Sequence, residues 1–257
     1  MPAAFAYINY ADAGVITASS SALLMQPAKL QHPIIARKWR GLLGGSEYLT
    51  IDLGASYPVD TVALFGLNLS LEGTTRVRAS LTDATAQIGE LYDSGNQVGK
   101  VDPYYTSLIH LLPSAVTARY VRIDLADSHV GCIEAGRLFV GKRVQPEVNF
   151  SAGWSKGWTD RSRITEGFGG QEYVDKDVSY RSVEITFEFL SDAERYGFVE
   201  EMDLLNGQST DVLFIEDTGS SNLGRDSIWG LMRDNQAVVQ PYSVGLFRKS
   251  YRIRERL

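Results

Sequence analysis

The chain has 257 residues, of which 25 are basic and 31 are acidic, so its formal net charge is −6. This acidic balance argues against a general nucleic-acid-binding protein, which needs a basic face to displace counterions. The single cysteine, Cys132, excludes an intramolecular disulfide and a zinc site built from cysteines. No run approaches 18 consecutive apolar residues, so no membrane-inserted helix is expected.

The chain begins with a segment that is typical of a strand. Residues 1–7 lack the basic region of a secretory signal, and polar residues follow at once. We therefore expect synthesis in the host cytoplasm as a soluble chain.

Residues up to 145 alternate between apolar and polar side chains in several short runs. The segment 59–65 is apolar almost throughout and predicts a more fully buried strand. No amphipathic helical period occurs before residue 146. Period-two runs separated by Gly, Asp, Asn and Ser indicate a β-sandwich or barrel. The alternating apolar positions are Leu49, Ile51 and Leu53, then Val77, Ala79 and Leu81, then Val121, Ile123 and Leu125.

The charge is distributed unevenly along the chain. Residues 1–145 are neutral, residues 146–247 carry a net charge of −10, and residues 248–257 carry +4. Pro146 lies at the first change and donates no ladder hydrogen bond. We therefore predict two domains, 1–145 and 146–257.

The second domain is predicted to be a β domain with one packed helix, over 191–206. Ser191 and Glu194 have the spacing of a capping box, and Gly207 is suited to end the helix. Residues 151–181, rich in Gly, Ser, Arg and Tyr, are predicted to form a long loop. The expected apolar stripe of the helix is Tyr196, Val199, Met202 and Leu205. The expected strands are 183–189, 212–215, 229–232 and 243–253.

The first domain resembles the discoidin, or coagulation-factor C-type, family of galactose-binding-like jelly rolls. The resemblance covers residues 20–142 and rests on the order of four segments, which are 47–54, 59–64, 118–123 and 133–141. Members of this family bind glycans, lipid headgroups or proteins through loops at one end of the barrel. The resemblance therefore implies a jelly-roll sandwich with a ligand site on its loops.

The side chains that the resemblance suggests for a glycan site are aromatic, cationic or amide groups, the types that suit a sugar ring and its hydroxyls. Trp39 has a second interpretation as a core aromatic. Some family members hold Ca²⁺, and Glu134 occupies a place from which a ligand can come. No dense Asp/Asn loop accompanies it, so no metal is predicted. The glycan-site candidates are Arg37, Lys38, Trp39, Arg40, Asn68, Tyr104, Tyr105 and His129.

The second domain resembles the tail hub and distal tail proteins of bacteriophages in its order of strand, helix and strand. This implies that 151–181 is an arm that contacts neighbouring subunits; the alternative is a flexible surface loop. The basic C-terminal run then faces a partner, or else it guards a solvated edge strand. The interface candidates are Trp154, Trp158, Phe168, Tyr173, Arg252, Arg254 and Arg256.

No catalytic constellation is found. The three histidines lack metal-ligand spacing, and no nucleophile elbow or Walker-type loop occurs. We therefore predict a non-enzymatic tail-tip component of a long-tailed phage virion, without cofactor. Its partners are expected to be copies of itself and other tail proteins, and its jelly roll either binds host-surface glycan or packs against neighbours. The alternatives are a free-standing carbohydrate-binding protein or adhesin, and a glycosidase that uses two carboxylates.

Overall fold

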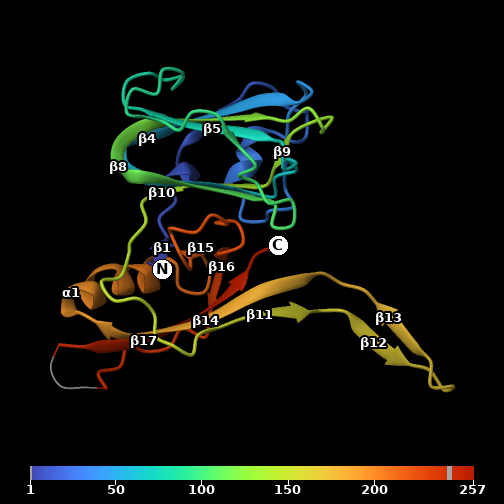
Figure 1. Cartoon of the computed structure of the whole chain (residues 1–257), viewed down its shortest axis with the longest axis vertical. Coiled ribbons are helices and arrows are strands. Elements are labelled where there is room, and N and C mark those ends of the chain that lie inside the picture. Colours follow the sequence, from blue (N-terminus) through green and yellow to red (C-terminus); the bar gives the residue numbers. More distant parts are fainter. Residues whose placement is uncertain (1, 242–244) are drawn as a thin grey trace. The chain divides into compact units, whose positions relative to one another are not determined.

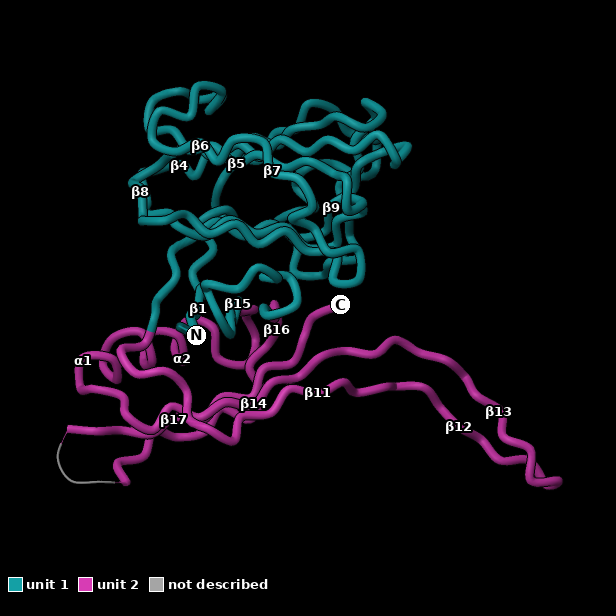
Figure 2. The backbone as a smooth tube through the Cα atoms, viewed as in Figure 1, with its two compact units in different colours: residues 1–145, 213–227 teal, residues 146–212, 228–257 magenta. Residues whose placement is uncertain are grey.

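A computed structural model describes residues 2–241 and 245–257 of the chain. These residues form two compact, mainly β units, shown in Figure 2. Unit 1 contains the residues up to Gln145 together with Leu213–Ser227, and unit 2 contains Pro146–Val212 and Ile228–Leu257. The predicted fold class, mainly β with sandwich sheets and one helix, is confirmed. The chain leaves unit 1 after Gln145 and returns to it for 213–227, a return that the sequence did not predict.

Two long strands build both layers of unit 1. β4 (Ser46–Phe65) and β8 (Ser107–Ala126) run antiparallel, with register shifts between Asp52 and Tyr57 and between Val59 and Thr61. Figure 1 shows both strands curving from one layer into the other. Gly54 lies at the bend of β4 with a φ of +81°, which glycine adopts at no steric cost.

Each half of β4 pairs with different neighbours, and this divides the sheet into two layers. In the first layer, β2 (Val15–Ala18) pairs with the first half of β4, and β5 (Thr74–Ser80) pairs with the second half of β8. In the second layer, β10 (Arg137–Gly141) pairs with the second half of β4. The short strands β6 (Tyr92–Asp93) and β7 (Gln97–Val98) pair with β5.

The core of unit 1 lies between these layers and contains the residues that the alternation predicted. The apolar positions of 49–53 and 121–125 are all buried. Burying one such side chain contributes about 1.5–3 kcal/mol. Leu81 differs from the prediction because β5 ends at Ser80, and its side chain is exposed.

Short elements complete unit 1. Two 3₁₀ helices, η1 (Tyr10–Asp12) and η2 (Pro27–Gln31), are the only helical elements before residue 146 among the described residues. β3 (Trp39–Arg40) pairs with β9 (Glu134–Ala135). β1 (Ala4–Ala6) pairs antiparallel with β15 (Val212–Ile215).

The sheet of unit 2 is antiparallel, in the order β16–β17–β14–β11. Val183, Ile185 and Phe187 are buried as predicted. A register shift between Phe187 and Leu190 then buries Leu190 and exposes Phe189, which the simple alternation had placed inside. The bounds of the strands are β11 (Ser155–Asp160), β14 (Ser179–Leu190), β16 (Ser227–Arg233) and β17 (Phe247–Glu255).

The predicted helix is present but interrupted. It consists of α1 (Asp192–Glu194), a π-type turn η3 (Arg195–Val199) and α2 (Glu200–Leu205), and both hydrogen bonds of the predicted capping box are formed at Ser191. Gly197, inside the π-type turn, has non-helical angles. This turn changes the helical register, so the buried face is Phe198, Val199 and Met202, while Tyr196 and Leu205 are exposed. The predicted stripe is therefore correct at two positions of four.

The segment 151–181 is not the long loop that the sequence predicted. It contains β11 and a two-stranded hairpin, β12 (Arg163–Glu166) paired with β13 (Glu172–Asp175), which extends beyond β11 and β14 in Figure 1. Every residue of β12 and β13 is exposed. Because neither face is buried, the sequence carries no alternation that would reveal the strands.

The C-terminal strand is not an edge strand. β17 lies between β14 and β16. It begins at Phe247, and the first two residues of the predicted strand 243–253, Ser243 and Val244, lie outside the described residues.

Candidate functional site

The topology of unit 1 brings widely separated loops to one end of the sandwich. Because β4 and β8 bend over in their middles, their starts and finishes return to the same end, where Ser46 pairs with Ala126 and Phe65 pairs with Ser107. We call this the loop end, formed by residues 19–45, 66–73, 99–106 and 127–136.

Backbone hydrogen bonds connect these loops to one another. The amide of Leu67 donates to the carbonyl of Thr106 at 2.9 Å. The amide of Asp127 donates to the carbonyl of Gly45 at 2.7 Å, and the amide of Gly41 donates to the carbonyl of Ile133 at 2.9 Å. The loop end is therefore a connected framework that holds its side chains in place.

Glu134 organises the cationic side chains of the loop end. Nε of Arg40 donates to its Oε1 at 2.6 Å across the β3–β9 pair, and Nζ of Lys38 lies 3.5 Å from its Oε2. The hydrogen bond that Arg40 donates to the Glu134 carboxylate, together with the charge of that carboxylate, raises the pKa of Arg40. Asn68 accepts from the Glu134 amide at 2.8 Å and donates to the Cys132 carbonyl at 2.8 Å. Asn68 thus positions the loop that carries Glu134.

The two tyrosines of the 99–106 loop have different surroundings. The Tyr104 side chain is 93% exposed, and its amide donates to the Asp102 carboxylate at 2.8 Å. The Tyr105 ring lies 5.9 Å from the Arg225 guanidinium and is partly covered. Tyr104 therefore offers an open aromatic face, whereas Tyr105 contacts residues of its own unit.

Arg37 and His129 are both exposed at the loop end. Nη1 of Arg37 lies 2.9 Å from Nε2 of His32.

The His129 amide donates to the buried Asp127 carboxylate at 2.8 Å, and the Ser70 amide donates to the same carboxylate at 2.6 Å. Burial raises the pKa of Asp127, but these hydrogen bonds outweigh burial and leave it below its usual value. Asp127 therefore stays ionised and fixes both loops.

The predicted contact between Trp39 and a ligand is wrong. Its side chain is 0% exposed, and its indole N–H donates to the carbonyl of Ser20 at 3.0 Å. A fully buried indole with a satisfied donor cannot contact a ligand, so Trp39 is a core residue. This was the alternative interpretation that the sequence left open.

Glu47 belongs to the framework of the loop end, and its role was not predicted from the sequence. It is buried, and it accepts from the Ser20 hydroxyl at 2.5 Å, from the Leu43 amide at 2.7 Å and from the hydroxyl of Ser19. It thus connects the beginning and the end of the segment 19–45. The sequence did contain an indication of this role. Glu47 lies two residues before the buried Leu49, so its side chain points to the same, inward face of the strand, where a charged group needs a partner.

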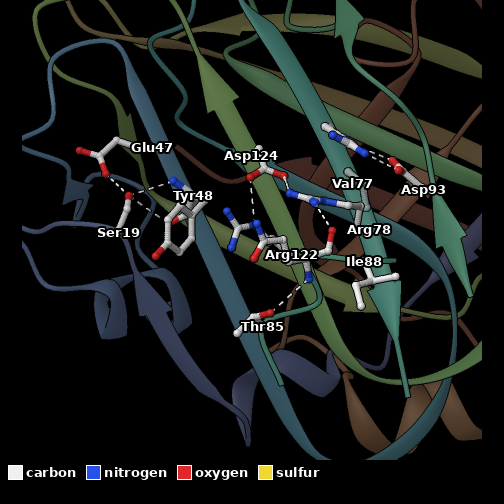
Figure 3. A network of polar contacts seen from close by, with 12 residues as sticks. Ser19, Glu47, Tyr48, Val77, Arg78, Thr85, Ile88, Asp93, Arg122 and Asp124 are labelled. Atoms are coloured by element: carbon white, nitrogen blue, oxygen red, sulfur yellow. Dashed lines mark hydrogen bonds and ion pairs between the residues drawn. The ribbon is translucent and has the colours of Figure 1, made fainter. Parts of the chain in front are cut away.

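The outer face of the first layer carries charged side chains that pair with one another (Figure 3). Asp124 accepts from Arg78 at 2.5 Å and from Arg122 at 2.9 Å. The guanidinium of Arg122 also covers the ring of Tyr48, 3.7 Å from its centroid. The aromatic ring that lines the shallow depression here, about 310 Å³, is that of Tyr48, and because Arg122 covers this ring we place no binding site there.

The predicted interface residues of 151–181 are exposed in unit 2. Trp154, Trp158 and Tyr173 are exposed in part, and Phe168 is exposed completely. The C-terminal arginines, by contrast, have partners in their own unit. Arg252 pairs with Glu184 at 2.9 Å, Arg254 lies 3.9 Å from the ring centroid of Tyr180, and Arg256 lies 3.4 Å from Asp211.

Within residues 2–241 and 245–257, no group of three or more His, Cys, Asp or Glu side chains is placed to hold a metal ion. Over the same residues, no helix has the length and apolarity needed to cross a bilayer.

Comparisons with known proteins give only distant likenesses. No protein-family model and no curated protein matches the sequence. A Ruminococcus gnavus GH29 fucosidase in complex with fucose is 17% identical, with 53% of this chain and 27% of the fucosidase covered and a TM-score of 0.43. This chain thus spans about a quarter of the fucosidase.

Smaller modules are covered almost completely. A family 32 carbohydrate-binding module of Clostridium perfringens NanJ in complex with galactose is 13% identical, with 54% of this chain and 99% of the module covered and a TM-score of 0.43. A chitosan-binding module from a chitosanase/glucanase of Paenibacillus sp. IK-5 is 18% identical, with 53% and 100% covered and a TM-score of 0.42. None of these three is a tail protein, and the resemblance of residues 146–257 to tail hub proteins stays a prediction.

Proposed function

We propose that the chain is a non-catalytic glycan-binding protein that binds sugar at the loop end of unit 1. The observation that carries this proposal is that Arg37, Arg40, Tyr104 and His129, which are exposed side chains of three separate loops, all lie at this one end of the sandwich. The open ring of Tyr104 suits the apolar face of a pyranose, and the guanidinium groups suit its hydroxyls.

The framework of the loop end supports the proposal energetically. Glu134 holds Arg40, and Arg37 lies against His32, so both guanidinium groups have fixed partners before a ligand arrives. A side chain that is already ordered loses less entropy on binding, typically about 0.5–1.5 kcal/mol less for each long side chain.

The test is calorimetric titration of the full chain with galactose, glucose, mannose, L-fucose and N-acetylgalactosamine. We expect saturable binding of at least one sugar, weakened about tenfold by Tyr104→Ala because the aromatic face is lost. The matched control is Tyr196→Ala, an exposed tyrosine on the helix of unit 2, which should bind as the wild type does. Absence of binding to every sugar, or equal weakening by both variants, would contradict the proposal.

A second role, self-assembly, is favoured by the hairpin of unit 2. Large apolar side chains on and beside it are exposed, and exposed apolar groups of this size mark interaction surfaces more often than free loops. We propose that the hairpin packs against a second copy of the chain. These side chains are Trp158, Ile164, Phe168, Tyr173 and Val174.

Sedimentation velocity over a range of concentrations tests this role. We expect a concentration-dependent oligomer that Phe168→Ser with Tyr173→Ser abolishes, while the control Leu204→Ser, an exposed apolar residue on α2, leaves it intact. A monomer at all concentrations would contradict self-assembly and favour the free-standing carbohydrate-binding protein or adhesin.

The narrower setting that we propose is the tail tip of a long-tailed phage virion, with other tail proteins as partners and host-surface carbohydrate as the ligand. The exposed hairpin and the sequence resemblance of residues 146–257 support it. Mass spectrometry of purified virions tests it, because a tail component must be present in fixed copy number. If the full chain hydrolyses a bound glycan, the glycosidase alternative replaces the non-catalytic one.

A further inference from the structure

Unit 2 contains a polar groove that belongs neither to the loop end nor to the hairpin 163–175. Its volume is about 500 Å³, and it lies over the outward face of β14 and β17, between the segments 151–155 and 234–239. We call it the β14–β17 groove.

The floor of the groove consists of hydrogen-bonded side chains from the two strands. Glu184 stands opposite Arg252 in register, and their side chains pair at 2.9 Å. Thr186 stands opposite Ser250, and their hydroxyls are 2.8 Å apart. The floor therefore presents carboxylate, guanidinium and hydroxyl groups in fixed positions.

One wall carries an aromatic ring. The Trp154 side chain is 41% exposed, and its ring meets Phe150 edge-on, with the centroids 5.5 Å apart. Phe150 in turn packs edge-on against the buried Phe187 at 6.3 Å. The Ser151 amide donates to the Thr186 carbonyl at 2.8 Å, which ties this wall to β14. The exposed part of the indole is thus supported from behind by the core.

The opposite wall is attached at two points. Val239 and Arg248 exchange two backbone hydrogen bonds, at 2.9 and 2.7 Å. Nζ of Lys249, on the inward side of β17, donates to Asn235 Oδ1 at 2.8 Å and to the Gln236 carbonyl at 2.5 Å. The groove is therefore formed before any ligand enters it, and binding needs no ordering of its walls.

The charges of the lining restrict the ligand. Three carboxylates, of Glu184, Glu188 and Asp234, face two guanidinium groups, of Arg248 and Arg252, so the lining has one net negative charge. An anionic ligand would meet net repulsion. A neutral ligand rich in hydroxyls can accept from the guanidinium groups and donate to the carboxylates.

We propose that the β14–β17 groove is a second binding site, for a neutral oligosaccharide, with one pyranose ring stacked on Trp154 and its hydroxyls bonded to the floor. An exposed, supported aromatic beside several oriented polar groups is the combination that sugar recognition uses. The inference stands on unit 2 alone and does not depend on the site proposed at the loop end.

The test is calorimetric titration of the full chain with maltohexaose, cellohexaose and N-acetylchitohexaose. We expect at least one to bind, about tenfold more weakly in Trp154→Ala, since a stacking partner is removed, and several-fold more weakly in Glu188→Ala. The control Tyr196→Ala removes an exposed aromatic ring that does not line the groove and should leave affinity unchanged. Tyr104→Ala should leave it unchanged as well.

Several results would overturn the inference. Absence of binding by all three hexasaccharides is one, and wild-type affinity in both Trp154→Ala and Glu188→Ala is another. Loss of binding in Tyr104→Ala alone would assign the sugar to the loop end and leave the groove without a ligand. Tighter binding of 3′-sialyllactose than of lactose, again dependent on Trp154, would contradict the neutral class.

Discussion

The ammonium group of Lys249 lies 2.6 Å from Oδ2 of Asp203, and the lysine side chain is only 1% exposed. This pair connects the central strand β17 to helix α2, while the other two hydrogen bonds of the ammonium group hold the segment 235–236. A buried charge with three partners is a structural centre of unit 2.

Replacing this lysine should destabilise unit 2. Lys249→Met leaves Asp203 and Asn235 without their donor, and breaking a buried pair from one side costs about 3–5 kcal/mol. Hydrogen exchange should therefore accelerate in β17 and α2 while the sandwich of unit 1 keeps its protection. The control Lys176→Met removes an exposed lysine and should change neither. Unchanged exchange in Lys249→Met would contradict the assigned role.

Trp39 should matter for stability and not through ligand contact. Trp39→Ala removes a fully buried indole, and large-to-small changes of this kind cost about 3–5 kcal/mol. Chemical denaturation followed by circular dichroism should show this loss, whereas Tyr104→Ala, at an exposed position, should unfold as the wild type does. A Trp39→Ala protein of wild-type stability would show that the indole is not part of the core.

Glu47 should determine how well the loop end is ordered. Glu47→Ala leaves the Leu43 amide and the Ser20 hydroxyl without their acceptor, at a cost of about 1–3 kcal/mol. The amide of Leu43 should then exchange faster, and sugar affinity at the loop end should fall. Glu72→Ala, a change at an exposed carboxylate, is the matched control. Equal exchange at Leu43 in both variants would contradict the positioning role.

His110 should make the stability of unit 1 depend on pH. Burial, with a smaller contribution from Lys100, lowers the pKa of His110 to about 4. The unfolded chain therefore binds more protons between about pH 6.5 and pH 4, so stability is complete above pH 6.5 and falls by up to about 1.4 kcal/mol per pH unit towards pH 4.

The variant His110→Gln isolates this effect. Glutamine offers a polar partner to the Tyr92 hydroxyl, which lies 2.9 Å from Nε2 of His110, but it does not titrate. Its unfolding free energy should change less between pH 6.5 and pH 4. A decline below about pH 4 should remain, because the hydrogen bond from Arg76 lowers the pKa of Asp93 to about 2. Parallel profiles for wild type and variant would contradict the assignment.

The parts of the fold that the sequence predicted are those in which burial follows a simple period. Leu49, Ile51 and Leu53 alternate with polar residues and line the core, and Ser191 with Glu194 forms the capping box. The failures occur where a local irregularity changes the register. A shift after Phe187 exposes Phe189, and the π-type turn at Gly197 moves Tyr196 to the surface.

For the candidate site, the sequence predicted which types of side chain take part but not the contacts that hold them in place. The sequence selected Arg40 and Tyr104 because their side chains suit a sugar, but it could not show that Glu134 holds Arg40, since the two residues are 94 positions apart. Trp39 was included among the contacts because its type fits a ligand as well as a core. The hairpin of 163–175 was missed because exposure on both faces leaves no periodic signal.

The most direct test of the central claim, glycan binding at the loop end, is an NMR titration of the isotope-labelled full chain with galactose, glucose, mannose, L-fucose and N-acetylgalactosamine in turn. The account predicts saturable amide shift changes concentrated in residues 37–40, 102–106 and 128–132. Saturable changes confined to other residues, or no saturable change with any of the five sugars, would contradict it.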